Sequence, residues 1–337
     1  MLINNVHAMS MDILKPELKQ HATPRQAVYL DATLKYGSAT RAAEELGVNR
    51  RTVDRSLSAV KRAAIEAGDI AVLDDQAKVL FLDIETAPIL AHIWQMWQEV
   101  RNIDQIIEDW YILSCGYKWM GDEDTYVTSL WDYPGYKPGV EDDRNLLGHI
   151  HELLCEADYV IAHNGDRFDI KKLNTRFVMN GFGPPTPYRS IDTLKIAKRA
   201  FGFTSNKLDF LAHVLLGKRK VKHDGLPLWQ GVLRGDAESC ETMDIYNAED
   251  VNLLEEVYYK LRAWDHLHPN MNLNTADDNM SCVVCGSHNV KPTGDTVAVG
   301  QAGLYLGYSC SDCGHQMRGR TNIRTMAQKH AGLVNAK

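Results

Sequence analysis

An apolar run that ends in two carboxylates constrains this chain more than any other stretch. Residues 78–88 read KVLFLDIETAP, so the apolar residues Val79 to Leu82 lead directly into Asp83 and Glu85. A run this apolar predicts a strand in the middle of a sheet, where both side-chain faces of the strand are buried. Asp83 and Glu85 then project from the same face, about 7 Å apart. Such carboxylates need a neutralising cation or proton, and oxygen ligands suit Mg²⁺ or Mn²⁺, although the pattern also fits a strand that ends in a polar turn.

Size and composition narrow the class of protein. A chain of 337 residues is long enough for two or three domains, and a net charge of -7 argues against a protein that binds polyanions over its whole surface. The N-terminal sequence does not resemble a signal peptide, and no stretch reaches the roughly 18 apolar residues of a membrane span, which predicts a soluble, cytoplasmic protein without membrane contact. Seven cysteines, four of them in two CxxC pairs, predict metal binding in a reducing compartment rather than disulfides.

Residues 24–67 contain three helical patterns separated by short turns, with Gly47 in the turn before the last one. The last helix places four apolar residues on one face: Val53, Leu57, Val60 and Ala64. Two short helices joined by a Gly-containing turn resemble the helix-turn-helix family. That resemblance implies DNA binding in the major groove, with Arg50, Arg51 and Arg55 facing the DNA. The alternative is a small trihelical module used for protein contacts.

The middle of the chain alternates strands and helices. Residues 89–109 are predicted to be helical, and Trp94 and Trp97 there fit a core more than a base-stacking platform. The predicted strands are 78–86, 111–120, 125–131 and 159–162, and the later helices are 142–157, 170–180, 194–201, 207–216 and 237–264. An initial meander followed by alternating strands and helices predicts an α/β fold with a mixed sheet flanked by helices.

Two more carboxylates stand where a cation is needed. Asp169 opens a helix directly after a strand, where the helix dipole favours an anion. On the last helix, the apolar stripe of Leu254 and Val257 leads back, by helical spacing, to Asp250 and then Tyr246. A charge on a buried stripe calls for a partner. Three well-separated segments therefore each direct a carboxylate towards what we expect to be one place.

The order and spacing of these residues resemble the DEDD-type 3′→5′ exonucleases of the ribonuclease H-like superfamily, tyrosine subclass, over roughly residues 78–264. The residues that match the three family motifs are, in order, Asp83, Ile84, Glu85 and Thr86; Asn164, Phe168 and Asp169; and Tyr246 and Asp250. Residues 94–121 and 222–232 also look like stand-alone exonucleases of phages and prophages. No polymerase domain follows in this sequence, so the resemblance is not to the proofreading part of a polymerase.

The resemblance implies a set of roles for the matching residues. It implies that Asp83, Glu85, Asp169 and Asp250 hold two Mg²⁺ or Mn²⁺ ions about 3.5–4 Å apart, one activating the attacking water and the other stabilising the leaving 3′-oxygen. Tyr246 would orient or help to deprotonate the water. Three residues would contact the terminal nucleotide or shape its pocket: Thr86, Asn164 and Phe168.

Several polar residues near these motifs keep more than one interpretation. Asp166 competes with Asp169 for the ligand position, and the family spacing favours Asp169. Asp192 either supports the site or ends a strand, and His163 has no role known from the family. The basic segment 218–222, with Lys218, Arg219 and Lys220, fits a grip on the phosphates of a single strand, or a solvated run of charge.

The C-terminal region carries two CxxCG sequences separated by β-like segments, 295–299 and 304–309, and followed by another at 316–320. The four cysteines are Cys282, Cys285, Cys310 and Cys313. This pattern resembles the zinc-ribbon family and implies one structural Zn²⁺ held by all four thiolates, with His288 and His315 as spare ligands at most. Cys115, Cys155 and Cys240 fit small core residues. No acidic residue follows Asp312, so the ribbon and tail fit a nucleic-acid contact or a protein-docking surface.

The sequence therefore predicts this order of parts: an irregular N-terminus (1–23), a helix-turn-helix (24–67), a linker (68–77), a ribonuclease H-like exonuclease domain (78–267), a zinc ribbon (278–320) and a basic tail (321–337). The hypothesis it favours is a metal-dependent 3′→5′ exonuclease that acts on single-stranded 3′ ends of DNA, with duplex DNA bound through the helix-turn-helix. Replication or repair proteins would be its partners. The alternatives are a non-catalytic DNA-binding regulator built on an inactive nuclease fold and an enzyme that trims RNA 3′ ends.

Overall fold

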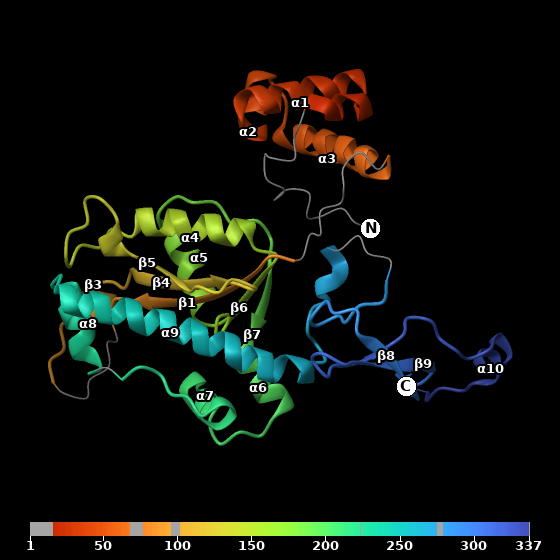
Figure 1. Ribbon diagram of the computed structural model, residues 1–337. Helices are drawn as coiled ribbons and strands as arrows, with labels where there is room; N and C mark the ends of the chain where they lie inside the picture. The colour runs from red at the N-terminus through yellow and green to blue at the C-terminus, as the bar shows by residue number, and fades with distance from the viewer. Residues whose placement is uncertain (1–15, 68–76, 96–101, 223, 275–278, 337) are drawn as a thin grey trace. The chain divides into compact units, whose positions relative to one another are not determined.

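The computed structural model describes residues 16–67, 77–95, 102–222, 224–274 and 279–336 (Figure 1). The chain divides into two compact units. One comprises residues 1–76 with 273–278, and the other comprises residues 77–272 with 279–337. The predicted linker at 68–77 falls almost wholly outside the described residues, and so do residues 1–15.

The N-terminal unit is helical, and its three main helices lie where the sequence predicts them. They are α1 (Pro24–Tyr36), α2 (Ala39–Glu45) and α3 (Arg50–Glu66), preceded by the 3-10 helix η2 (Pro16–His21) where irregular chain was expected. Thr23 caps α1 through a capping box, and Gly37 ends it with a left-handed conformation that glycine adopts readily. The predicted apolar face of α3 is buried against α1 and α2 in a core that includes Leu30 and Ala43.

The larger unit is built on a mixed five-stranded sheet (Figure 1). Its strands are β1 (Val79–Thr86), β4 (Ile112–Trp119), β5 (Tyr126–Ser129), β6 (Tyr159–Ala162) and β7 (Arg189–Asp192), in the spatial order β5-β4-β1-β6-β7. Strand β1 pairs with β4 in antiparallel and with β6 in parallel orientation. The predicted central strand is therefore confirmed, and so is the mixed sheet.

Helices cover both faces of this sheet (Figure 1). Helices α4 (Arg144–Glu156) and α5 (Asp169–Met179) pack with Leu80, Leu82 and Ile84 of β1. Val79 and Phe81, which point the other way, pack with α6 (Thr193–Ala200), α7 (Leu208–Leu216) and α9 (Ala237–Leu261). An additional helix, α8 (Leu226–Leu233), precedes α9, and η4 (Leu130–Asp132), η5 (Arg262–Trp264) and η6 (Met271–Asn274) are short 3-10 turns.

The helix predicted at residues 89–109 is wrong wherever that segment is described. The chain forms β2 (Leu90–Ala91), η3 (Ile103–Gln105) and β3 (Ile106–Glu108), with β2 and β3 paired in antiparallel orientation. The apolar spacing fitted a helix, but β-branched isoleucines also favour extended chain, and the Gln105 side chain holds the carbonyl of His92 across the pair. Trp94 is 89% exposed, so it does not belong to the core, and Trp97 lies outside the described residues.

The C-terminal part of the larger unit is a three-stranded antiparallel sheet, consistent with a zinc ribbon. Its strands are β8 (Val290–Val299), β9 (Gly303–Cys310) and β10 (Gln316–Arg318), and a short helix, α10 (Met326–Ala331), follows. Among the described helices of both units, none combines the length and the apolar character that crossing a membrane requires.

Candidate active site

The end of strand β1 supplies the first two acidic groups. Ile84 is buried on the face of the sheet that α4 and α5 cover. Asp83 and Glu85, on either side of Ile84 in the strand, project from the opposite face. Oxygen atoms of Asp83, Glu85 and Asp250 all lie within 4.8 Å of one another. The structure thus brings a carboxylate from α9 to the two carboxylates of β1.

A glycine on the neighbouring strand lets α9 approach the sheet closely enough to do this. Gly116 lies beside Asp83 in the β1–β4 pair. A Cβ atom at Gly116 would stand 2.8 Å from the backbone oxygen of Asn247 and 2.9 Å from a methyl group of Val251, both on α9. Only a residue without a side chain accommodates that contact. The helix therefore crosses β4 directly beside Asp83.

Asn247 joins the two elements by hydrogen bonds. Its side-chain amide donates to the backbone oxygen of Asp83 at 3.2 Å and to Asp83 Oδ2 at 2.9 Å. Its own Oδ1 accepts from the hydroxyl of Ser114 at 3.1 Å. Both Asn247 and Ser114 are fully buried, so this chain of hydrogen bonds fixes the orientation of the Asp83 carboxylate.

The turn between β6 and α5 carries Asp169 to the same place. Asp169 opens α5 and is buried, and its Oδ1 accepts from the backbone amide of Ile84 at 3.1 Å. Gly165 makes the turn possible, because a Cβ atom there would lie 2.5 Å from that of Ala162. Asp169 is thereby held against β1 at Ile84, the residue between Asp83 and Glu85.

Asp192 and Asn164 hold this turn from the other side. Asn164 has a left-handed backbone with φ of 69°, which is uncommon outside glycine, and its amide donates to Asp192 Oδ1 at 2.9 Å. The same oxygen caps α6 by accepting from the amide of Leu194. His163 is bound to Thr193 and to the carbonyl of Asn206, each at 2.9 Å, and burial lowers its pKa to about 4. The hydrogen bonds of Asp192 and His163 therefore stabilise the turn that carries Asp169.

The acidic groups strongly perturb one another. Burial, followed by the charges of Asp169 and Glu85, raises the pKa of Asp83 well above its usual value. Burial and then the charge of Asp250 raise the pKa of Glu85 to about 8. Burial also raises the pKa of Asp169 to about 7, against backbone hydrogen bonds that lower it. Carboxyl groups in this state take up protons near neutral pH unless cations compensate them, and carboxylate oxygens are the donors that Mg²⁺ and Mn²⁺ prefer.

Tyr246 and Lys220 complete the cluster. Tyr246 precedes Asp250 by one turn of α9, and burial raises the pKa of its phenol, so it is protonated at neutral pH. The Lys220 ammonium donates to the Tyr246 hydroxyl at 3.1 Å and pairs with Asp250 Oδ2. Asp250 itself is only 1% exposed. The indole of Trp229, on α8, donates to the carbonyl of Thr86 at 3.1 Å and packs edge-on against Tyr246.

The other predicted contact residues lie in different surroundings. Thr86 ends β1 and is half-buried, and Phe168 is partly exposed immediately before Asp169. Lys218 pairs with Glu256 and Arg219 with Asp209, so both bind carboxylates of this unit. Asp166 points away from the cluster: it accepts from the Ser190 hydroxyl and pairs with Lys195. Arg50 and Arg55 are exposed on α3, and the side chain of Arg51 lies outside the described residues.

The four C-terminal cysteines form a second, separate cluster. All four sulfur atoms lie within 4.8 Å of one another, with Sγ–Sγ distances of 3.6 Å for Cys282–Cys313 and for Cys285–Cys310. A tetrahedral Zn²⁺ takes thiolate ligands in such a set, so this cluster could bind zinc. His315 Nδ1 instead donates to the carbonyl of Ala263 at 2.8 Å, and His288 is exposed. Cys115 and Cys240 are buried core residues, and Cys155 is partly buried.

Sequence reasoning missed four residues that shape the acidic site. Gly116, Gly165, Ser114 and Asn247 carry no ligand charge, and only the fold brings them beside one. Asn247 stands three residues before Asp250, so its position on the same face of α9 could have been noticed. The ion pair of Lys220 with Asp250 is a further contact that the sequence does not predict, because a basic run by itself indicates a phosphate contact or solvated charge.

A comparison with protein families agrees with this architecture. A family described as the RNase H superfamily matches residues 112–262, from the start of β4 to just beyond α9. The match includes Asp169, Tyr246 and Asp250, and the sheet places Asp83 and Glu85 beside them. No curated protein matches the chain. The fold is RNase H-like, which points to a nuclease-type, metal-dependent function and to a nucleic acid as substrate.

Proposed function

We propose that residues 78–267 form a DEDD-type 3′→5′ exonuclease, which hydrolyses phosphodiester bonds one nucleotide at a time from the 3′ end of DNA. The observation that carries this proposal is the convergence of four carboxylates from three elements, with the Tyr246 hydroxyl beside them. Asp83 and Glu85 come from β1, Asp169 from the start of α5 and Asp250 from α9. An inactive relative would be free to lose at least one of these costly acids, of which Asp169 and Asp250 are buried.

These carboxylates suit two divalent cations by their chemistry. Their oxygen donors and raised pKa values are what a site for Mg²⁺ or Mn²⁺ requires. We assign Asp83, Glu85, Asp169 and Asp250 as the ligands. When bound, the cations would supply an activated water and stabilise negative charge on the phosphate and the leaving oxygen.

The chain's own residues would position the reacting groups. The Tyr246 phenol, which keeps its proton, would orient the attacking water by a hydrogen bond. Asn247 holds Asp83 in a fixed orientation, and the amide of Ile84 does the same for Asp169. Thr86, Asn164 and Phe168 lie on the segments that carry these acids, and we assign them to contacts with the terminal nucleotide.

The other modules would hold the substrate. We assign α1–α3 as a helix-turn-helix for duplex DNA, with Arg50, Arg51 and Arg55 as its contacts, and residues 278–320 as a zinc ribbon with one Zn²⁺ on the four cysteines. Basic residues after the last cysteine would add phosphate contacts: Arg318, Arg320, Arg324 and Lys329. We assign replication or repair proteins as partners of the enzyme.

The direct test is to incubate the full-length protein with 5′-labelled single-stranded DNA and RNA of the same sequence in Mg²⁺. A ladder that shortens from the 3′ end on DNA supports the proposal. A ladder on RNA alone would assign the same site to RNA trimming, and no product from either strand in Mg²⁺ or Mn²⁺ would refute an enzymatic role. The matched preparation is Asp83→Ala: if it cut as fast as the wild type, the activity would belong to a contaminant.

A further inference from the structure

The Lys220 side chain reaches into the acidic site from a segment outside the sheet. Its ammonium pairs with Asp250 Oδ2, donates to the Tyr246 hydroxyl at 3.1 Å and lies 5.1 Å from the centre of the tyrosine ring. Burial alone would lower the pKa of Lys220, but the negative charge of Asp250 and its neighbours raises it, so the ammonium stays charged. A positive charge is thus paired with Asp250, one of the carboxylates that we assign as metal ligands.

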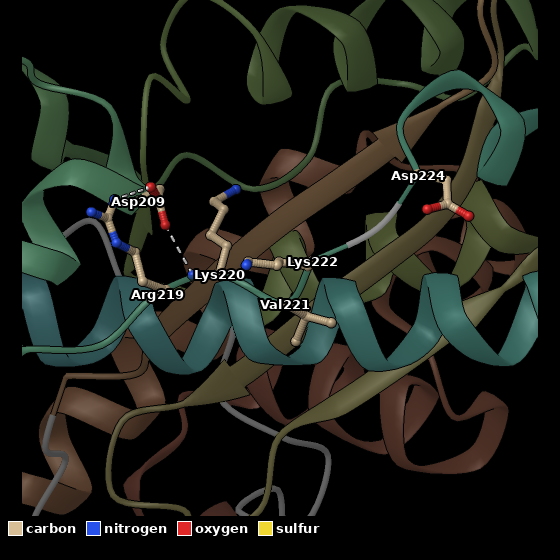
Figure 2. Close-up of a pocket in the computed structure, with 6 residues that line it drawn as sticks. All are labelled: Asp209, Arg219, Lys220, Val221, Lys222 and Asp224. Carbon is tan, nitrogen blue, oxygen red and sulfur yellow. Dashed lines mark hydrogen bonds and ion pairs between the residues drawn. The ribbon is translucent and has the colours of Figure 1, made fainter.

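The backbone around Lys220 is fastened independently of that contact. The Lys220 amide donates to Asp209 Oδ1 at 3.0 Å, and Arg219 pairs with Asp209 Oδ2 at 2.7 Å (Figure 2). Asp209 belongs to α7, which packs against α9. Four rotatable bonds separate the fastened backbone from the ammonium. The side chain can therefore leave Asp250 without any movement of the segment that carries it.

An open pocket of about 780 Å³ adjoins Lys220 and offers the ammonium a second place. Its lining includes three basic side chains of one segment, Arg219, Lys220 and Lys222, together with Val221 and the acids Asp209 and Asp224 (Figure 2). Asp209 is already bound to Arg219, and Asp224 offsets one of the two lysines, so three basic and two acidic side chains leave the lining with one net positive charge. A pocket of this kind suits a phosphate group.

The charges of the site favour such an exchange. The four carboxylates carry four negative charges when ionised, and Lys220 supplies one positive charge. Two divalent cations would neutralise the carboxylates completely. The lysine would then be in excess by one charge, which matches the single negative charge of a phosphodiester.

We propose that the Lys220 ammonium is an exchangeable counter-ion: a divalent cation displaces it from Asp250, and the released side chain binds a phosphate of the nucleic-acid substrate in the adjoining pocket. The second half of this proposal rests on the proposed nuclease function. The first half concerns only the cation and this chain.

Lysine footprinting of the wild-type protein tests both halves without any substitution. The full-length protein is treated briefly with an amine-reactive reagent, and labelling of Lys218, Lys220 and Lys222 is quantified by mass spectrometry. Labelling of Lys220 is expected to rise at least about threefold when Mg²⁺ is added, because the ammonium leaves its ion pair and its 27% exposure increases. It is expected to fall again when a single-stranded oligonucleotide with hydrolysis-resistant 3′-terminal phosphorothioates is added with Mg²⁺.

The neighbouring lysines are the internal controls. Lys218 pairs with Glu256 and Lys222 is exposed, so Mg²⁺ alone should leave the labelling of both unchanged. Unchanged labelling of Lys220 in saturating Mg²⁺ would overturn the exchange. A rise with Mg²⁺ that the oligonucleotide does not reverse would overturn the phosphate contact and leave the exchange supported.

Cation affinity gives a second measurement. Lys220→Met removes the competing charge, so it is expected to bind Mn²⁺ at least about tenfold more tightly than the wild type, as measured by the electron paramagnetic resonance of free Mn²⁺. Lys222→Met, two residues on in the same pocket, is expected to change the Mn²⁺ affinity by less than about twofold. Equal or weaker Mn²⁺ binding by Lys220→Met would contradict the exchange.

These readouts separate the two proposals. Both Mn²⁺ binding and Mg²⁺-dependent labelling are measured without any cleavage. If the protein shortens no nucleic acid but Mg²⁺ exposes Lys220, the nuclease function fails and the exchange stands. If the protein shortens DNA while Lys220 labelling ignores Mg²⁺, the opposite holds.

Discussion

The acidic cluster and the cysteine cluster assemble their ligands in opposite ways. The cysteines come from two short turns of one small sheet, and few apolar residues pack with them. The carboxylates come from β1, α5 and α9, elements far apart in sequence that two large apolar clusters hold in place. A small ribbon has too little core to form without its metal, whereas a sheet flanked by helices forms its site in advance.

That difference teaches what each cation would do for the molecule. In the ribbon, a bound Zn²⁺ would stabilise the fold, because the cysteines make up most of the small buried core. In the acidic site, the fold stabilises an unfavourable arrangement of charge, and a cation would relieve it. Loss of a ligand should therefore unfold the first site and inactivate the second.

The largest expected effect is on the ribbon. Cys310→Ser removes one thiolate from a closed set, so the zinc content should fall from about one ion per chain to near zero, and residues 279–336 should become sensitive to protease. Cys155→Ser, at a partly buried cysteine of α4, should keep the zinc. Metal analysis and limited proteolysis measure both. Full zinc content and protease resistance in Cys310→Ser would remove the contrast between the two clusters.

The next largest effect is on catalysis and compares two acids of one turn. Asp169→Asn should lower the single-turnover rate of DNA cleavage by at least about 10³-fold, since it removes several kcal/mol of charge interaction from the site. Asp166→Asn should change the rate by less than about threefold, because Asp166 faces Ser190 and Lys195 instead. Both variants should give the circular dichroism spectrum of the wild type. Comparable losses of rate in the two variants would mean that Asp169 is not distinguished from Asp166 as a metal ligand.

The same contrast explains how far the sequence could be interpreted. The ribbon cysteines are predictable because CxxC spacing is local, and β1 is predictable because its apolar run is unmistakable. The mixed sheet followed from the alternation of elements, and it is confirmed. The isoleucine and tryptophan spacing of residues 89–109 suits both a helix and a strand, and only the pairing of β2 with β3 distinguishes the two.

Within the site, sequence could identify the charged ligands but not what holds them. Asp250 is recognisable as a charge on an apolar stripe, yet nothing local to Gly116 indicates that α9 will cross it. Close approach between a helix and a strand is a property of their packing, which depends on every layer of the core. Lys220 presents the same difficulty, because its partner Asp250 lies thirty residues further along the chain.

A pH series sharpens the comparison at intermediate size. Glu85 and Asp169 have folded pKa values of about 8 and about 7, raised above the ordinary values of 4.5 and 3.8. The folded state therefore binds more protons than the unfolded state between these limits, so the stability they confer is complete below about pH 4 and is lost as the pH rises through 7 and 8. We expect the melting temperature of the Mg²⁺-free protein to fall across pH 5 to 8, as followed by circular dichroism.

Two controls isolate the acidic site in that series. Glu85→Gln removes one titrating group, so its melting temperature should fall less steeply with pH than that of the wild type. Saturating Mg²⁺ should flatten the wild-type curve, because a bound cation replaces the protons. A curve that keeps its slope in Mg²⁺, or that rises with pH, would mean that the acidic cluster is not the source of the strain.

The smallest expected effect concerns the hydrogen bonds behind Asp83. Ser114→Ala leaves the buried Oδ1 of Asn247 without its donor, which costs about 1–3 kcal/mol of folding free energy and loosens the amide that orients Asp83. The single-turnover rate should fall about three- to tenfold, and urea unfolding should give the loss of stability. Ser190→Ala removes a hydroxyl of the same kind, one that binds Asp166 rather than a residue of the cluster, so its cleavage rate should stay within about twofold of wild type. If both variants slowed cleavage equally, the loss of rate would come from lower stability of the whole fold. The idea that the hydrogen bonds of Ser114 and Asn247 orient Asp83 would then be wrong.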